Sequence, residues 1–186
     1  MSPTAVRRAC LLGALSLLQT ATPLRAQEPG DPGRLRVHAS CRPTVVSDAA
    51  ERSATVRALV VRLERSDLIV YVRCAARRSP AYAARLGLLG AARAVRVVLI
   101  ELGAGLPWSE QAALVGHELQ HAIEIADAPW VRDARTMAAL YRQVGMEAPG
   151  APGVFETRAA IEAGDRTRRE WFERAGDRPA RQRRLR

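Results

Sequence analysis

The stretch "LVGHELQHAIEIAD", residues 114–127, carries the strongest structural signal in the sequence. It places His117 and His121 four positions apart, with Glu118 directly after the first histidine. Residues i and i+4 lie one turn apart on the same face of a helix, so both imidazoles can point at one ion. The stretch therefore predicts a metal-binding helix. The alternative is a helix with one buried and one exposed histidine and no metal.

Each residue of the H-E-x-x-H pattern has a role in zinc chemistry. Imidazole nitrogens bind Zn²⁺ well, at about 2.0–2.1 Å. Glu118 projects about 100° around the helix from His117, which places its carboxylate beside the ion rather than on it. Zinc lowers the pKa of a bound water to about 7, and a carboxylate beside it can take the proton. The pattern thus favours a hydrolytic zinc site with Glu118 as general base.

A catalytic zinc usually has three protein ligands, so the two histidines need a partner. Asp127 stands at an offset that supplies a third ligand in some H-E-x-x-H sites. Such sites need a glycine to turn the chain, and Glu124 stands at that position here. Glu156, in "FETRAA" (155–160), is the stronger candidate because a later helix is expected to begin there. Both carboxylates stay open as the third ligand, with Glu156 favoured.

With "HELQHA" after an apolar strand and "FETRAA" downstream, the chain resembles the gluzincin branch of the zincin metallopeptidases. The resemblance implies zinc ligands at His117, His121 and Glu156, with Glu118 as the base. It also implies a peptide or protein substrate. In such enzymes an edge strand above the site binds the substrate backbone, and "AVRVVLIEL" (94–102) would be that strand.

The resemblance leaves the groups around the ligands less defined. Family members often carry an acidic residue four positions after the ligand glutamate, where this chain has Ala160. Glu124 or Asp133 could supply the missing hydrogen bond to a histidine instead. A donor for the transition state could come from Tyr141 or Arg158.

The composition indicates one domain without a nucleic-acid partner. The chain has 186 residues, a size that suits a single core. All 29 basic residues are arginine, which together with abundant Ala, Gly and Pro is typical of GC-rich codon usage. The net charge of +10 is therefore weak evidence for nucleic acid, and no binding motif accompanies it. The basic residues 177–186 are expected to form a disordered tail.

The first 26 residues have the features of a signal peptide. Arg7 and Arg8 precede the apolar run 9–18, and Ala26 offers a cleavage position. The run is too short for a membrane anchor, which needs about 20 residues. We therefore expect export to the periplasm or the extracellular space, with residues 27–33 disordered and no transmembrane segment after cleavage. Two cysteines then remain, Cys41 and Cys74, and in an exported protein they are expected to pair.

Periodicity predicts an α+β domain over residues 34–176. We expect a strand at 34–39, a helix capped by Ser47, a strand at 67–74, and a hairpin at 82–102 that turns at 90–92. The motif helix follows with Ser109 as its cap, and then two further helices, starting near 129 and 155. The expected fold is a small zincin-like domain with a short, mostly antiparallel sheet and one N-terminal helix.

These observations together predict an exported zinc-dependent metallopeptidase. A different class also fits them, namely a non-catalytic envelope binding module that zinc stabilises. A third possibility, an envelope protein that binds anionic polymer or lipid through its arginine-rich tail, rests on charge alone.

Overall fold

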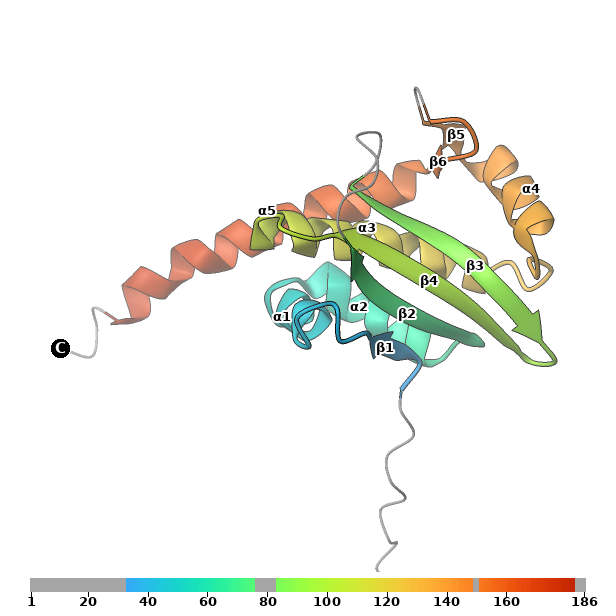
Figure 1. Cartoon of the computed structure of the whole chain (residues 1–186). Helices are drawn as coiled ribbons and strands as arrows, with labels where there is room; N and C mark the ends of the chain where they lie inside the picture. Colours follow the sequence, from blue (N-terminus) through green and yellow to red (C-terminus); the bar gives the residue numbers. More distant parts are fainter. Residues whose placement is uncertain (1–32, 76–82, 149–150, 183–186) are drawn as a thin grey trace, which may run out of the picture. The chain divides into compact units, whose positions relative to one another are not determined.

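The computed structural model describes residues 33–75, 83–148 and 151–182 (Figure 1). By contacts the chain divides into Met1–Asp31 and Pro32–Arg186, and every described residue belongs to the second unit. The expected signal peptide, 1–26, and residues 27–32 lie outside the described residues. No helix among the described residues is long and apolar enough to cross a membrane.

The structure confirms the α+β class. The elements in chain order are β1 (Leu35–Val37), α1 (Val45–Arg52), α2 (Ala54–Glu64), β2 (Leu68–Ala75), β3 (Ala84–Ala92), β4 (Val95–Gly103), α3 (Trp108–Ala126), α4 (Ala134–Val144), β5 (Met146–Glu147), β6 (Phe155–Glu156) and α5 (Arg158–Gln182).

The main sheet is mixed rather than mostly antiparallel, which corrects the expectation. Its strand order is β1-β2-β4-β3. β1 runs parallel to β2, β2 runs parallel to β4, and only β3 pairs antiparallel, with β4. The parallel pair β1–β2 follows from the helices between the two strands, because a strand–helix–strand connection returns the chain in the same direction. β5 and β6 form a separate two-stranded hairpin that the sequence analysis did not anticipate.

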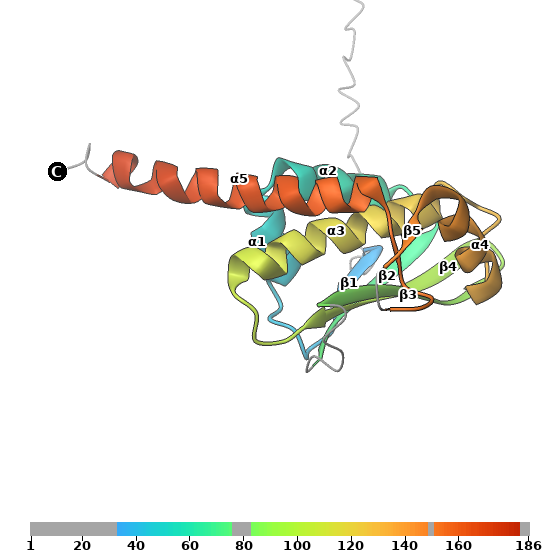
Figure 2. The same cartoon turned by 90° about the horizontal axis from the view of Figure 1, so that it is seen from above.

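The helices α1, α2, α3 and α5 all lie on one face of the main sheet, as the view in Figure 2 shows. Alternate residues of the central strands point into this layer, and they include Val70, Val98 and Ile100, each at most 1% exposed. Leu63 of α2 and Leu119 of α3 meet them from the helical side, both fully buried. Burial of these aliphatic side chains supplies the main stabilisation of the fold.

The expected single N-terminal helix is two helices, divided at Ser53. The extended backbone of Ser53 ends α1, and its hydroxyl accepts a hydrogen bond of 3.1 Å from the backbone N–H of Val56 to cap α2. The side chain of Glu170 on α5 accepts from both Ser53 and Thr55 at this junction. The expected cap at Ser47 was wrong because that residue lies inside α1.

Three further boundaries differ from the sequence expectation. The β3–β4 turn lies at Arg93 and Ala94 rather than 90–92, and Arg93 adopts a left-handed φ of 48°. α3 begins at Trp108 with Pro107 as its N-cap, so Ser109 is not the cap. α4 begins at Ala134 rather than near 129, because Asp133 forms a capping box with Thr136.

The last helix also differs at both ends. Glu156 lies on the short strand β6, and α5 starts only at Arg158. At the other end α5 continues to Gln182, so residues 177–182 are helical rather than part of a disordered tail.

A disulfide joins Cys41, which follows β1, to Cys74 on β2, as expected. The two cysteines are 33 positions apart in sequence. The bond ties the loop before α1 to the central part of the sheet.

Two glycines allow α3 and α5 to approach closely. A Cβ atom on Gly116 would lie 2.3 Å from the hydroxyl oxygen of Thr167. A Cβ atom on Gly164 would lie 3.3 Å from Cβ of His117. The absence of side chains at these positions therefore places the backbone of α5 directly against the histidine-bearing part of α3.

Candidate metal centre

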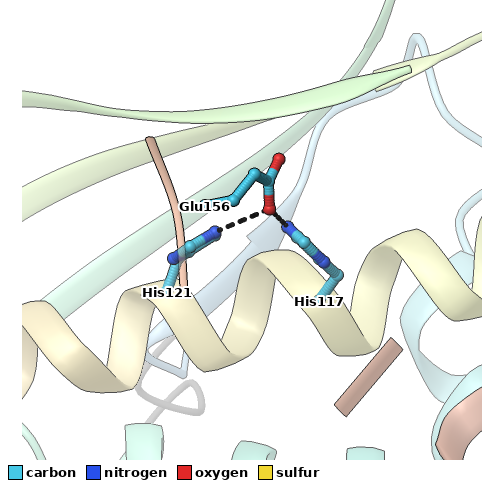
Figure 3. Close-up of side chains that lie close together, drawn as sticks. All are labelled: His117, His121 and Glu156. Carbon is cyan, nitrogen blue, oxygen red and sulfur yellow. Dashed lines mark ion pairs between the residues drawn. The ribbon is translucent and has the colours of Figure 1, made fainter. Parts of the chain in front are cut away.

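His117, His121 and Glu156 converge on one point, although the glutamate comes from a different element (Figure 3). Nε2 of His117 lies 2.9 Å from Oε2 of Glu156, and Nε2 of His121 lies 3.8 Å from the same oxygen. One ligand atom from each residue lies within 4.8 Å of the other two. The helical spacing places the histidines on one face of α3, and β6 brings the carboxylate over them.

The donor set and its spacing fit a metal ion. Ligand atoms at about 2.0–2.2 Å from a tetrahedral ion are about 3.3–3.6 Å apart, and the observed 2.9 and 3.8 Å lie on either side of that range. Oε2 of Glu156 is buried and has no partner with hydrogen-bond geometry. A buried polar atom in this condition is costly unless something else binds it. The group can therefore hold a metal ion.

The charges of the three residues support each other. Burial raises the pKa of Glu156, but contacts with His117 and His121 outweigh burial and lower the pKa to about 2. Burial lowers the pKa of His121, but the hydrogen bond to Glu124 and the contact with Glu156 outweigh burial and raise the pKa to about 9. The glutamate is thus ionised at neutral pH, and a metal ion would displace a proton from Nε2 of His121.

Glu118 lies beside this group and is 3% exposed. Burial raises its pKa to about 7, although His121 and His117 partly oppose the shift. Its Oε2 atom is buried without a hydrogen-bond partner. A carboxylate with a pKa near neutrality, held beside a candidate metal group, is suited to accept and return a proton.

Glu124 orients His121 from the same helix. Its Oε2 accepts a hydrogen bond of 2.9 Å from Nδ1 of His121, and its Oε1 accepts one of 2.6 Å from the hydroxyl of Thr157. Because Nδ1 is the donor, the ring presents Nε2 toward Glu156. The sequence analysis proposed Glu124 or Asp133 as the carboxylate that hydrogen-bonds a histidine, and in the structure this residue is Glu124.

Asp133 and Asp127 are not part of the site. Asp133 accepts a hydrogen bond of 2.7 Å from the backbone N–H of Thr136 and caps α4 at an exposed position. Asp127 is the C-cap of α3, and its exposed carboxylate pairs with Arg62 at 2.9 Å. Asp127 as a third ligand and Asp133 as a partner of a histidine were both wrong. Each carboxylate lies at the end of a helix and binds a group there instead.

Tyr141 and Arg158 do not offer free donors to the site. The hydroxyl of Tyr141 donates a hydrogen bond of 3.2 Å to the backbone carbonyl of His121, and its ring meets the His121 ring edge-on at 5.4 Å. Tyr141 therefore supports the backbone of α3. The guanidinium of Arg158 is exposed and pairs with Glu162 at 2.8 Å.

The strand beside the site is β3 rather than the stretch 94–102. β4, which that stretch forms, is paired on both sides, with β2 and β3, and so has no free edge. In the described sheet β3 is an edge strand, and its residues Ala84 and Leu86 line a cavity of about 180 Å³ together with the histidines, Glu118 and Glu156. The alternation of β4 reflects burial in the middle of a sheet, which the sequence pattern cannot distinguish from an edge.

The sequence analysis missed Thr157 and Phe155, which flank the glutamate. Thr157 is 3% exposed and joins Glu124, while the ring of Phe155 stacks on Tyr141 with centroids 6.3 Å apart. Thr157 also accepts a hydrogen bond of 3.1 Å from the N–H of Ala160. A threonine at position 157 is a typical N-cap, and this pattern could have indicated that α5 begins after Glu156.

No protein-family model, curated protein or solved structure matches this chain. The resemblance to gluzincins therefore stays a prediction from the sequence motif.

Proposed function

We propose that the chain is an exported zinc-dependent metallopeptidase. The proposal rests on the convergence of His117, His121 and Glu156, with the buried carboxylate of Glu118 beside them. Two imidazoles and one carboxylate are a common ligand set of hydrolytic zinc, which leaves one position for substrate or water. When bound, zinc would polarise the carbonyl group of the substrate and activate a water molecule.

The chain's own residues have separate tasks in this reaction. Glu118 accepts a proton at its buried carboxylate and returns it to the leaving amine. Glu124 fixes the ring of His121 through Nδ1. Among the described strands β3 pairs with β4 alone, so its outer edge could bind an extended peptide by backbone hydrogen bonds.

The disulfide supports the proposed export to the periplasm or the extracellular space. Stable disulfides form in oxidising compartments such as the periplasm and the extracellular space. The bond between Cys41 and Cys74 therefore agrees with export by the predicted signal peptide. Mass spectrometry of the protein secreted from a bacterial host tests this, since cleavage after Ala26 would leave Gln27 as the first residue.

The decisive experiment is Glu118→Gln, which removes the base and leaves the three metal-binding residues unchanged. We expect the variant to bind zinc by calorimetry and to lose hydrolysis of a mixed peptide library by at least about 100-fold. Glu110→Gln is the matched control, because Glu110 lies on the same helix and pairs with Arg168 instead. Equal cleavage by Glu118→Gln and wild type would contradict the proposed role of Glu118.

One observation favours a second function, a binding module that zinc stabilises without catalysis. The cavity at the histidines is about 180 Å³, which is below the roughly 300–1,000 Å³ usual for ligand sites. In this case zinc would raise the melting temperature of wild type and Glu118→Gln equally, and neither protein would cleave the library.

A further inference from the structure

A second cavity, of about 720 Å³, lies between the C-terminal part of α3, α4 and the start of α5. Its volume is within the range of small-molecule sites. Consecutive residues divide between the two cavities: Tyr141 and Glu156 line the cavity at the histidines, whereas Leu140 and Thr157 line this one. Glu124 lies in its wall, so the second cavity adjoins the metal group without sharing its ligands.

The apolar part of the second cavity is exposed to solvent. Trp130 is 46% exposed and Val144 is 51% exposed, and both line the cavity together with the buried Leu140. An indole ring on the surface of a concave site is a favourable contact for a flat or branched apolar group. The apolar part of a ligand would gain most by packing here.

The polar part of the second cavity is acidic in a basic chain. Its lining contains three carboxylates, Glu124, Asp127 and Glu162, against one guanidinium, Arg158, whereas the whole chain has 29 arginines against 19 acidic residues. Asp127 and Glu162 each pair with one arginine at the surface, where ion pairs are weak. Each carboxylate can accept more hydrogen bonds than one such pair provides.

We propose that the second cavity binds a small amphipathic cation. Its aromatic or branched apolar body packs on Trp130 and Val144, and its ammonium group faces the carboxylates. The charge of the lining disfavours an organic anion of the same shape. This proposal does not rest on zinc binding or on hydrolysis, and it stands if the peptidase proposal fails.

Calorimetric titration of the full chain with three matched indoles tests the charge preference. Tryptamine, tryptophol and indole-3-acetate share one apolar body and carry a positive, neutral and negative group. We expect tryptamine to bind at least about tenfold more tightly than tryptophol, because it adds a charge-assisted contact, and indole-3-acetate to bind most weakly. Equal affinities for the three probes, or no heat from tryptamine, would overturn the proposal.

Two variants locate the site. Trp130→Ala should weaken tryptamine binding about tenfold or more, whereas Trp108→Ala should not, because Trp108 is 37% exposed but stands outside this cavity, under Arg42. The double variant Asp127→Asn with Glu162→Gln should reduce the ratio of the tryptamine affinity to the indole-3-acetate affinity by at least about tenfold. Equal losses in the two tryptophan variants, or an unchanged charge preference in the double variant, would place binding elsewhere and overturn the assignment.

Discussion

The hydroxyl of Thr157 donates a hydrogen bond of 2.6 Å to Glu124, the residue that also accepts from Nδ1 of His121. Thr157 follows Glu156 directly, so this bond connects the strand that carries one candidate ligand to the helix that carries the other two. Glu124 thereby contacts both the Nδ1 side of His121 and the residue that follows Glu156.

We therefore predict that Thr157→Val lowers zinc affinity by about 10- to 100-fold, the usual effect of losing a hydrogen bond behind a metal ligand. Calorimetric titration of the metal-free protein with zinc measures this. Thr157→Ser is the control, since it keeps both the hydroxyl and the cap of α5, and should bind zinc nearly as wild type does. An unchanged affinity in the folded Thr157→Val protein would show that the link does not position the ligands.

The sequence predicted the part of the site that depends on one helix. The i, i+4 spacing determines the relation of His117 to His121 and needs no tertiary information. Glu156 was named as a candidate, but on a helix, because the cap at Thr157 was not recognised. Its place on β6 depends on the hairpin with β5, which consists of two residues on each side and has no sequence pattern of its own.

The fold class followed from periodicity, but the direction of the strands did not. Parallel pairing of β1 and β2 was available from the order strand–helix–strand, yet β1 has only three residues and gives a weak signal. The buried Arg96 could not be predicted, because an arginine in an apolar strand is normally exposed. Its partners lie before β2 and around the end of α3, and only the folded chain brings them beside it.

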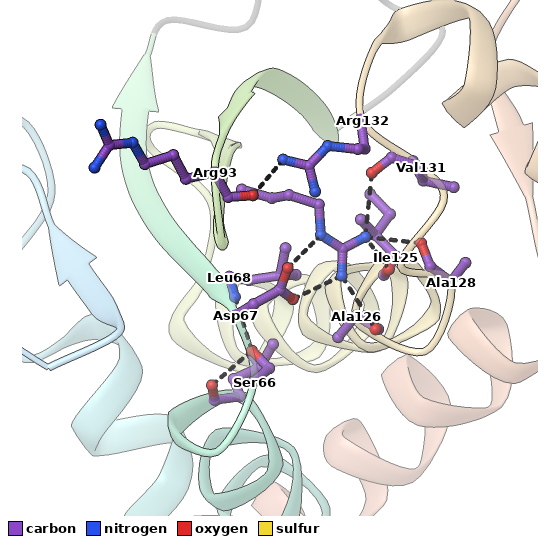
Figure 4. Close-up of polar contacts among 11 residues, drawn as sticks. Ser66, Asp67, Leu68, Arg93, Ile125, Ala126, Ala128, Val131 and Arg132 are labelled. Atoms are coloured by element: carbon purple, nitrogen blue, oxygen red, sulfur yellow. Dashed lines mark hydrogen bonds and ion pairs between the residues drawn. The ribbon is translucent and has the colours of Figure 1, made fainter.

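Arg96 is fully buried and contacts residues at the C-terminal end of α3. Figure 4 labels the residues that bind its guanidinium, among them Asp67 and Ala126. Its guanidinium donates to the backbone carbonyls of four residues and pairs with Asp67 at 2.7 Å. The four carbonyls belong to Ile125, Ala126, Ala128 and Val131. One side chain thus satisfies the end of the motif helix and joins it to β4.

We predict that Arg96→Met lowers the free energy of unfolding by about 3–5 kcal/mol, because it removes the hydrogen bonds to four carbonyls and leaves the carboxylate of Asp67 without its guanidinium partner. Urea unfolding measures the loss. Arg62→Met is the matched control: Arg62 is exposed and pairs only at the surface with Asp127, so the change should be under about 1 kcal/mol. Similar losses in both variants would mean that the Arg96 contacts are not a special source of stability.

The same pair gives the stability a dependence on pH. The hydrogen bonds from Arg96 hold the pKa of Asp67 below its ordinary value, although partial burial opposes the shift. A lowered pKa means that the ionised carboxylate stabilises the folded chain. This stabilisation is fully present above the unfolded pKa of about 3.9 and is lost as the pH falls through the lower folded value.

Asp67→Asn should therefore cost more stability at pH 6 than at pH 3. We expect about 2 kcal/mol at pH 6, less than for a fully buried pair because the Asp67 side chain is 34% exposed. Unfolding in urea at the two pH values gives both differences. A difference between variant and wild type that stays constant from pH 6 to pH 3 would refute the linkage.

The tight packing of α3 against α5 at Gly116 predicts the effect of one added methyl group. In Gly116→Ala the new Cβ would lie 2.3 Å from Oγ1 and 3.0 Å from Cβ of Thr167. Rotating the hydroxyl removes the first contact but not the second, so the helices must separate. We expect the free energy of unfolding to fall by about 1–3 kcal/mol, despite the roughly 1 kcal/mol that alanine gains over glycine in a helix.

Gly87→Ala is the control, because a Cβ there meets nothing within 4 Å. Zinc binding should also weaken in Gly116→Ala, since α5 lies directly against His117 at Gly164. A variant as stable as wild type would show that the two helices can move apart without cost.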